Sequence, residues 1–177
     1  MTGRVFLVVG PSGAGKDTLL AGAAAADPRL HWARRVITRD TAAGGEPFEG
    51  VTESAFQARL QAGEFALQWQ AHGLCYGVPY AELRPLQDGR DVLINGSRAA
   101  LPAALAAFPG LRVIQISAPM AVLADRLASR GRESHADIIA RLQRANYALP
   151  EGIPAIEISN DASPEKGIAK LLYALRA

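Results

Sequence analysis

A glycine-rich loop near the start of the chain has the residue types that bind phosphate. It consists of Gly10, Pro11, Ser12, Gly13, Ala14, Gly15, Lys16, Asp17 and Thr18. The apolar segment 5–9 precedes the loop and a helical pattern at 19–26 follows it, which is the order of a P-loop. Glycines let backbone N–H groups approach a phosphate, while the helix N-terminus and Lys16 add positive charge. The loop predicts ATP as a phosphoryl donor, with Mg²⁺ near Asp17 and Thr18.

Asp17 stands where the P-loop pattern has Ser or Thr. Asn95 and Ser97 end the third expected strand, where P-loop proteins often hold a carboxylate for magnesium. Asn95 can orient a ligand hydroxyl or a metal-bound water, although an Asn–Gly pair is also typical of a plain turn. We hypothesise that Asp17 returns to the magnesium site the negative charge that Asn95 does not supply.

Five arginines gather in one glycine-broken segment: Arg126, Arg130, Arg132, Arg141 and Arg144. Phosphoryl transfer needs positive charge around the moving group, and bidentate arginine suits phosphate oxygens. We therefore expect a mobile lid at about 127–142, with Arg130 and Arg141 at the transition state and Arg126 at the nucleotide. The alternative is a solvated helix face with an exposed pair between Asp137 and Arg141.

Arg35 and Arg39 flank a short apolar segment at 36–37, where a long insertion begins. Two arginines at this place favour the binding of an anionic acceptor, because guanidinium groups match phosphate oxygens. The structural alternative is pairing with Asp40 or Glu46, since ion pairs of this kind are common.

Apolar segments alternate with helical patterns, which predicts an α/β fold with a parallel sheet flanked by helices. The expected strands are 5–9, 36–37, 91–95, 112–117 and 155–159. The expected helices are 52–61, 98–108, 120–130 and 136–149, and a last helix that begins at Ser163. Ligands of such a fold lie beyond the carboxyl ends of the strands.

Residues 38–83 are too many for a simple crossover between two parallel strands, and they predict an inserted acceptor-binding subdomain. We expect a single domain of the P-loop type over residues 1–177. Its core comprises 1–37 and 84–177, and the arginine-rich lid belongs to the second of these parts.

Composition excludes several classes of protein. The chain has 177 residues, of which 49% are hydrophobic, and a net charge of +2, too small to imply nucleic acid or membrane partners. The lone Cys75 excludes an internal disulfide and a four-cysteine metal site. The first apolar run is too short for a signal peptide. Trp32 and Trp69 are expected in the core. We expect a cytoplasmic monomer or homodimer that acts on a small molecule.

Along nearly its whole length the chain resembles the guanylate kinase family. Besides the P-loop and the arginine segment, the resemblance rests on Thr38-Arg39, Gly63-Glu64-Phe65, Tyr76-Gly77, the segment 89–93 and Asn160-Asp161. It implies that Arg39 and Tyr76 bind the acceptor phosphate. It also implies that Asn160 and Asp161 lie near adenine.

Three departures from that family concern its contacts with guanine. Leu67 stands where guanylate kinases have a glutamate that binds the base, and Val78 replaces their Ser or Thr. Asn95-Gly96-Ser97 replaces an Asp-x-Asp motif. A base edge buried without partners would cost about 1–3 kcal/mol for each unsatisfied group. The departures therefore argue against guanine as the ligand.

The ribose 1,5-bisphosphate phosphokinase branch of the family is a closer match. The chain resembles it in residues 10–17, 37–40, 76–78, 91–98 and 130–133, and departs from it at Pro47 and Phe48. The branch implies transfer of the ATP γ-phosphoryl group to ribose 1,5-bisphosphate, which forms 5-phosphoribosyl 1-diphosphate and ADP. An acceptor with two phosphates and no base fits arginines and small polar groups, supplied here by Arg35, Arg39, Asn95, Ser97 and Arg98.

Two alternatives remain open. One is a nucleoside monophosphate kinase with an altered base preference, for which Leu67 and Val78 are the discriminating positions. The other is a guanylate-kinase-like interaction module without catalysis. Such modules resemble the family but lack an intact P-loop, whereas this chain retains Lys16.

Overall fold

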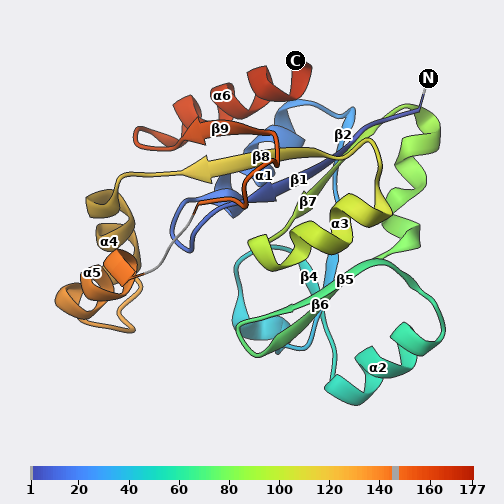
Figure 1. Cartoon of the computed structure of the whole chain (residues 1–177), viewed down its shortest axis with the longest axis horizontal. Coiled ribbons are helices and arrows are strands. Elements are labelled where there is room, and N and C mark those ends of the chain that lie inside the picture. The colour runs from blue at the N-terminus through green and yellow to red at the C-terminus, as the bar shows by residue number, and fades with distance from the viewer. Residues whose placement is uncertain (1, 145–147) are drawn as a thin grey trace.

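The apolar segments form a parallel sheet in the part of the chain that the computed structural model describes, residues 2–144 and 148–177. Five strands of this part lie in the order β2-β7-β1-β8-β9 (Figure 1). They are β1 (Val5–Val9), β2 (Leu30–Trp32), β7 (Asp91–Asn95), β8 (Arg112–Ser117) and β9 (Ala155–Ser159). The central strand β1 is buried throughout, as its purely apolar sequence predicts. The P-loop thus begins at the carboxyl end of the central strand.

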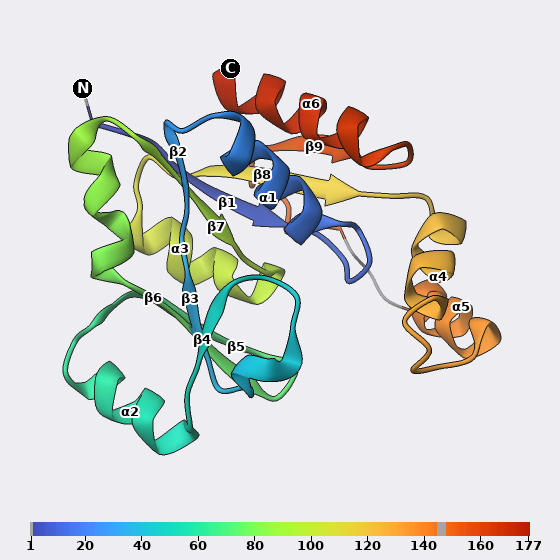
Figure 2. The same cartoon turned by 180° about the vertical axis from the view of Figure 1, so that it is seen from behind.

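Helices cover both faces of this sheet, which confirms the predicted α/β fold. Helix α1 (Lys16–Ala26) and helix α6 (Pro164–Arg176) cover one face, and α3 (Leu101–Ala107) covers the other (Figures 1 and 2). Ser163 caps α6, because its side chain accepts a hydrogen bond from the Lys166 N–H. The last helix therefore begins where the sequence predicts.

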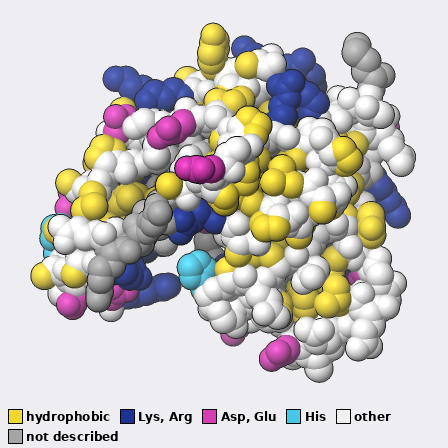
Figure 3. Space-filling model, in the orientation of Figure 1, with side chains coloured by type: hydrophobic (Ala, Val, Ile, Leu, Met, Phe, Trp, Pro, Cys, Tyr) yellow, Lys and Arg dark blue, Asp and Glu magenta, His cyan; other side chains and the backbone are white. Residues whose placement is uncertain are grey.

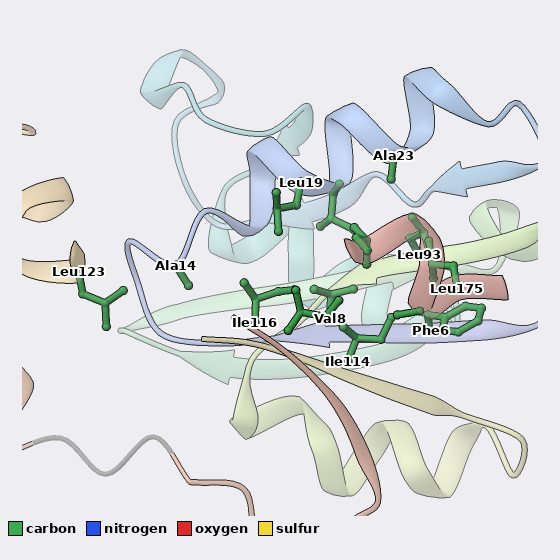
Figure 4. Close-up of a cluster of buried hydrophobic side chains, with 14 of the residues drawn as sticks. Phe6, Val8, Ala14, Leu19, Ala23, Leu93, Ile114, Ile116, Leu123 and Leu175 are labelled. Carbon is green, nitrogen blue, oxygen red and sulfur yellow. The ribbon is translucent and has the colours of Figure 1, made fainter. Parts of the chain in front are cut away.

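Side chains of β1 alternate between two hydrophobic clusters. Phe6 and Val8 point toward α1 and α6, where they pack with Leu19 and Ile114 (Figure 4). Leu7 points to the opposite face and packs in the cluster that α3 joins. The sheet is thus buried on both sides at the strand that carries the P-loop.

A second, mixed sheet of the described chain has the strand order β4-β3-β6-β5. Its strands are β3 (Arg35–Ile37), β4 (Phe48–Gly50), β5 (Phe65–Ala71) and β6 (Leu74–Pro79). The helix predicted near 52–61 is α2 (Glu53–Gln61), capped by the Thr52 side chain. Short 3₁₀ helices η1 (Thr41–Ala43), η2 (Tyr80–Asp88) and η3 (Arg98–Ala100) complete the connections.

The assignment of residues 36–37 to the central sheet is wrong. These residues belong to β3, which pairs in parallel with β4 and antiparallel with β6. The edge of the central sheet is β2 instead, which pairs with β7. A strand of three residues carries too little periodicity to be identified from its sequence, and pairing between distant segments decides which sheet it joins.

Helices α4 (Met120–Ala128) and α5 (His135–Arg144) pack together and project beyond the carboxyl ends of the central strands (Figures 1 and 2). Of the helix predicted over 136–149, residues 145–147 lie outside the described residues, as does the side chain of Arg144. Residues 148–150 are not helical. No helix of the described chain is long and apolar enough to cross a membrane.

The packing around β8 predicts a large effect of truncating one buried side chain. Ile114 is fully buried between the sheet and α1, so Ile114→Ala is expected to lower the free energy of unfolding by about 2–5 kcal/mol. Leu105→Ala serves as control, because Leu105 is 39% exposed, and we expect it to cost under about 1 kcal/mol. Urea denaturation measures both values. Equal effects of the two substitutions would contradict this account of the core.

Candidate active site

A polar cavity of about 440 Å³ opens where the P-loop, the second sheet and the segment after α4 meet. Figure 3 shows the surface hollowed between α4–α5 and the rest of the molecule, with Lys and Arg side chains gathered there. The cavity lining unites residues that the sequence assigns separately to the donor and to the acceptor: Lys16, Asp17, Arg39, Tyr76, Asn95 and Arg130. The cavity lies at the carboxyl ends of the strands, as expected for this fold.

Lys16 is held inside the P-loop by backbone oxygens. Its Nζ donates to the carbonyl oxygen of Gly10 at 2.7 Å and to that of Pro11 at 3.3 Å. Burial lowers the pKa of Lys16 to about 8; Asp17 opposes this shift, whereas Arg35 and Arg130 add to it. A phosphate between these cations would favour the protonated amine.

Arg126 and Asn160 bind the backbone of the P-loop. The Arg126 guanidinium donates to the carbonyl oxygens of Gly13 and Ala14 at 3.2 and 3.3 Å, and to that of Asn160 at 2.8 Å. Asn160 Nδ2 donates to the Ala14 carbonyl oxygen at 2.8 Å. Gly15 has φ 89°, and a Cβ there would lie 2.6 Å from Asn160 Nδ2. Both side chains therefore brace the loop.

The structure does not bring Asp17 and Thr18 to a common point. Asp17 lines the main cavity, whereas Thr18 lines a second cavity together with Arg126 and Asn160. Consecutive helical side chains point in directions about 100° apart, which accounts for the separation. Asp161 lines neither cavity and lies 3.6 Å from Lys170. Of the two residues expected at magnesium, Asp17 is the one that shares the main cavity with the Lys16 amine.

Asp17 and Asn95 are in direct contact, although 78 positions separate them in the sequence. Asn95 Nδ2 donates to Asp17 Oδ1 at 2.7 Å. The described residues contain no cluster of three or more His, Cys, Asp or Glu that could hold a metal ion. Mg²⁺ is commonly bound by one or two carboxylates together with substrate phosphates, so a single Asp17 carboxylate fits such a site.

Polar atoms without partners occur among the residues that line the main cavity. Four buried side-chain atoms of its lining have no hydrogen-bond partner within the described chain: Arg39 Nε, Trp69 Nε1, Asn95 Oδ1 and Ser97 Oγ. Buried polar groups are normally paired, so four unpaired ones around a single cavity indicate a polar ligand. Trp69 was expected in the core, and its side chain does pack there, although the residue also contributes to the cavity lining.

Aromatic rings and an ion pair hold Arg35. Its guanidinium lies 4.9 Å from the ring centre of Tyr76, which stacks on Trp69 at 5.2 Å. Arg35 Nε donates to Glu46 Oε2 at 3.0 Å, which is the pairing left open from the sequence. Arg39 does not pair with Asp40: it donates to the Gly44 carbonyl oxygen at 3.2 Å and lies beside the cavity.

Two predicted arginines have other partners. Arg98 is exposed, donates to the Ala148 carbonyl oxygen at 3.3 Å and does not line the main cavity. Arg141 pairs with Glu133 at 3.0 Å. The alternative pair of Arg141 with Asp137 is wrong, because Asp137 accepts a hydrogen bond from Ser134 instead.

Arg130 lines three neighbouring cavities around the P-loop. It lines the main cavity and the cavity of Thr18, and together with Arg132 and Arg141 it lines a third cavity beside Ser12. The three arginines thus converge on the outer side of the P-loop. This placement brings together the charges expected around a moving phosphoryl group.

The positions that would read a base are apolar and buried. Leu67 is 3% exposed and Val78 is fully buried, and both belong to the cluster between the two sheets. Neither side chain lines the main cavity. This part of the site offers no hydrogen-bonding side chain at the two positions.

Known proteins resemble the chain over its full length. No protein-family model matches it. "Ribose 1,5-bisphosphate phosphokinase PhnN" of Ruegeria sp. (strain TM1040) is 48% identical over 177 residues, which cover 99% of the chain and 93% of the relative. The protein of that name from Agrobacterium fabrum is 45% identical over 175 residues, which cover 97% and 96%.

Other relatives are longer. "Bifunctional ribose 1,5-bisphosphokinase-thymidine phosphorylase" of Cupriavidus necator is 47% identical over 176 residues, so 99% of the chain spans 29% of that protein. Among solved structures, guanylate kinase from Anaplasma phagocytophilum has a TM-score of 0.69 at 20% identity, covering 99% of the chain and 85% of that structure. An unliganded sugar kinase from Janibacter sp. HTCC2649 has a TM-score of 0.53 at 19% identity, with 98% and 95% covered. These structural likenesses show the fold alone.

The lowered pKa of Lys16 predicts how ATP binding depends on pH. The amine binds phosphate as an ammonium ion, so affinity is expected to stay constant below about pH 8 and to fall above it. The fall is at most about tenfold per pH unit, because one proton is lost. Calorimetric titration without magnesium from about pH 7 to about pH 9.5 measures it. Lys16→Met should bind weakly with little pH dependence; a wild-type affinity constant over this range would contradict the assignment.

Proposed function

Because the chain belongs to the family of ribose 1,5-bisphosphate phosphokinases, we propose that it transfers the γ-phosphoryl group of ATP to ribose 1,5-bisphosphate. The products are 5-phospho-α-D-ribose 1-diphosphate and ADP. One observation supports this choice of acceptor. Arg39, Asn95 and Ser97 line the cavity. The two positions that would contact a base, Leu67 and Val78, are apolar and buried. A phosphorylated sugar can form hydrogen bonds with these guanidinium, amide and hydroxyl groups, and it has no base that would need polar partners.

The donor is held by the P-loop in this proposal. The backbone N–H groups of 10–18 and the Lys16 amine bind the β- and γ-phosphates of ATP. Magnesium, when bound near Asp17, offsets part of the phosphate charge. Thr18 lies on the side of the loop away from the acceptor, where the rest of the nucleotide would extend. Asn160 acts indirectly, by its hydrogen bond to the P-loop backbone. Contact of Asp161 with adenine stays a prediction.

The acceptor is held by the inserted subdomain, for which we keep the bounds 38–83, and by the residues at the end of β7. Arg39 and Tyr76 bind a phosphate of the acceptor, and Asn95 and Ser97 bind its hydroxyl groups. The residues of 127–142 form the lid, in which Arg130 stands beside both ligands. Arg141 would leave Glu133 to join it when the lid closes. These roles follow from position and charge.

The reaction needs positioning and charge more than covalent chemistry from the protein. An oxygen of the acceptor 1-phosphate forms a bond with the γ-phosphorus as the bond to the ADP oxygen breaks. The attacking oxygen is already ionised, so no general base is required. Lys16 and Arg130 compensate the negative charge spread over the transferring group.

A panel of acceptors tests the proposal. With ATP and Mg²⁺, ribose 1,5-bisphosphate is expected to be turned over at least about 100-fold more efficiently than GMP, because the site lacks polar partners for a base. Formation of ADP and of the diphosphate product, followed by ³¹P NMR, measures both. Turnover of GMP without turnover of the sugar would favour the nucleoside monophosphate kinase alternative. Absence of nucleotide binding would favour the non-catalytic module.

The charge at Asp17 predicts the magnesium requirement. Asp17→Asn removes a charge beside Lys16 and keeps the size of the side chain, so the Mg²⁺ concentration for half-maximal turnover should rise about fivefold or more. Asp27→Asn is the control, because Asp27 lies at the other end of α1 and pairs with Arg29. An unchanged magnesium titration for Asp17→Asn would contradict the role of this carboxylate.

A further inference from the structure

Glu46 is a buried carboxylate in the wall of a cavity rich in cations. It lines the main cavity and is 6% exposed. Its Oε2 accepts a hydrogen bond from Arg35 Nε at 3.0 Å, and its Oε1 pairs with a second nitrogen of the same guanidinium. Oε1 also accepts a long hydrogen bond, of 3.5 Å, from Asn95 Nδ2. Glu46 thus connects two residues expected at the acceptor.

The first consequence concerns the charge of Arg35. This arginine is 8% exposed, and its guanidinium lies over the ring of Tyr76. A bidentate pair with Glu46 occupies one edge of the guanidinium and cancels its charge. This part of the wall is therefore neutral, so we expect it to attract a phosphate less than Arg39, which has no carboxylate partner among the described ion pairs.

The second consequence concerns the orientation of the Asn95 amide. Its Nδ2 donates to Asp17 at 2.7 Å and lies within 3.5 Å of Glu46, and carboxylates accept but do not donate. The carboxylates of Asp17 and Glu46 therefore hold Asn95 Nδ2 toward themselves, and Asn95 Oδ1 points away from them. Asn95 Oδ1 is buried without a partner within residues 2–144 and 148–177. An orphaned carbonyl oxygen needs a donor.

The chemistry of that donor follows from the other unpaired atoms. An ionised phosphate oxygen accepts hydrogen bonds and would be repelled by the Asn95 carbonyl, whereas a hydroxyl can donate to it. Ser97 Oγ and Trp69 Nε1 are also buried and unpaired in the described chain, and both residues contribute to the lining of the same cavity. The Ser97 hydroxyl can donate or accept a hydrogen bond, and the Trp69 N–H can only donate one. Together with the Asn95 carbonyl oxygen, these groups match the hydroxyl groups of a sugar ring.

We propose that Glu46 is a positioning residue that makes this wall of the cavity bind the ring hydroxyl groups of the acceptor in preference to its phosphates. It does so by neutralising Arg35 and by holding the Asn95 carbonyl toward the ligand. This inference rests on the proposed function and goes beyond it, because it assigns the selection of a hydroxylated ring to a residue that would not touch the phosphates.

Glu46→Gln tests the proposal, with ribose 1,5-bisphosphate and its 2-deoxy and 3-deoxy analogues as acceptors. The wild-type enzyme should prefer the parent sugar over at least one analogue by about 100-fold in kcat/KM, since an unpaired buried group penalises the analogue. In Glu46→Gln this ratio should fall about tenfold or more, with KM for the parent sugar raised and KM for ATP nearly unchanged. Glu46→Asp, which keeps the charge, should restore part of the ratio.

A matched control separates this effect from a change in folding. Glu49→Gln removes a carboxylate of the same subdomain that pairs with Arg59 at the surface, and it should leave the ratio unchanged. If Glu46→Gln does not fold, Asn95→Ala keeps the Arg35–Glu46 pair, and it should lose the same discrimination. Wild-type turnover with an unchanged ratio in the variants, or no preference in the wild type, overturns this inference alone. No wild-type turnover of the sugar overturns the proposed function, and this inference with it.

Discussion

The site depends on how the carbonyl oxygens of the P-loop are bound. A loop that turns its N–H groups toward a phosphate must find donors for its carbonyls, because buried backbone groups cannot be left unpaired. Lys16 binds two carbonyls at the start of the loop, and Arg126 and Asn160 bind those near its middle. These donors come from α1, α4 and the segment after β9, so the loop also fixes the elements around it.

The concentration of charge in the cavity imposes a second constraint. Burial lowers the pKa of Lys16, and the charges of Arg35 and Arg130 lower it further. Asp17 opposes this shift at Lys16, and Glu46 forms an ion pair with Arg35. The two carboxylates thus allow a cationic site to be assembled before any phosphate arrives. The Asn95 amide donates hydrogen bonds to both carboxylates, so it connects Asp17 beside the P-loop with Glu46 beside Arg35.

Local patterns predicted much of this molecule, and contacts between distant segments account for the remainder. The P-loop, the parallel strands and the Ser163 cap are encoded within a few residues each, so their sequence patterns suffice. The sheet that strand 36–37 joins depends on partners far along the chain. Arg98 follows Ser97, yet a 3₁₀ turn carries it away from the cavity. The buried environment of Glu46 appears only after the second sheet has formed.

Two positions at which the chain departs from guanylate kinases, Leu67 and Val78, form one cross-strand pair. Leu67 on β5 lies directly opposite Val78 on β6, so the two positions that would contact a base are neighbours in the sheet. A polar residue at either position alone would face an apolar partner and stay unsatisfied, at a cost of about 1–3 kcal/mol. As an apolar pair, the two side chains instead join the cluster between the two sheets. Trp69 and Tyr76, the rings against which Arg35 packs, belong to the same cluster, so the apolar pair helps to support the part of the cavity wall that holds Arg35.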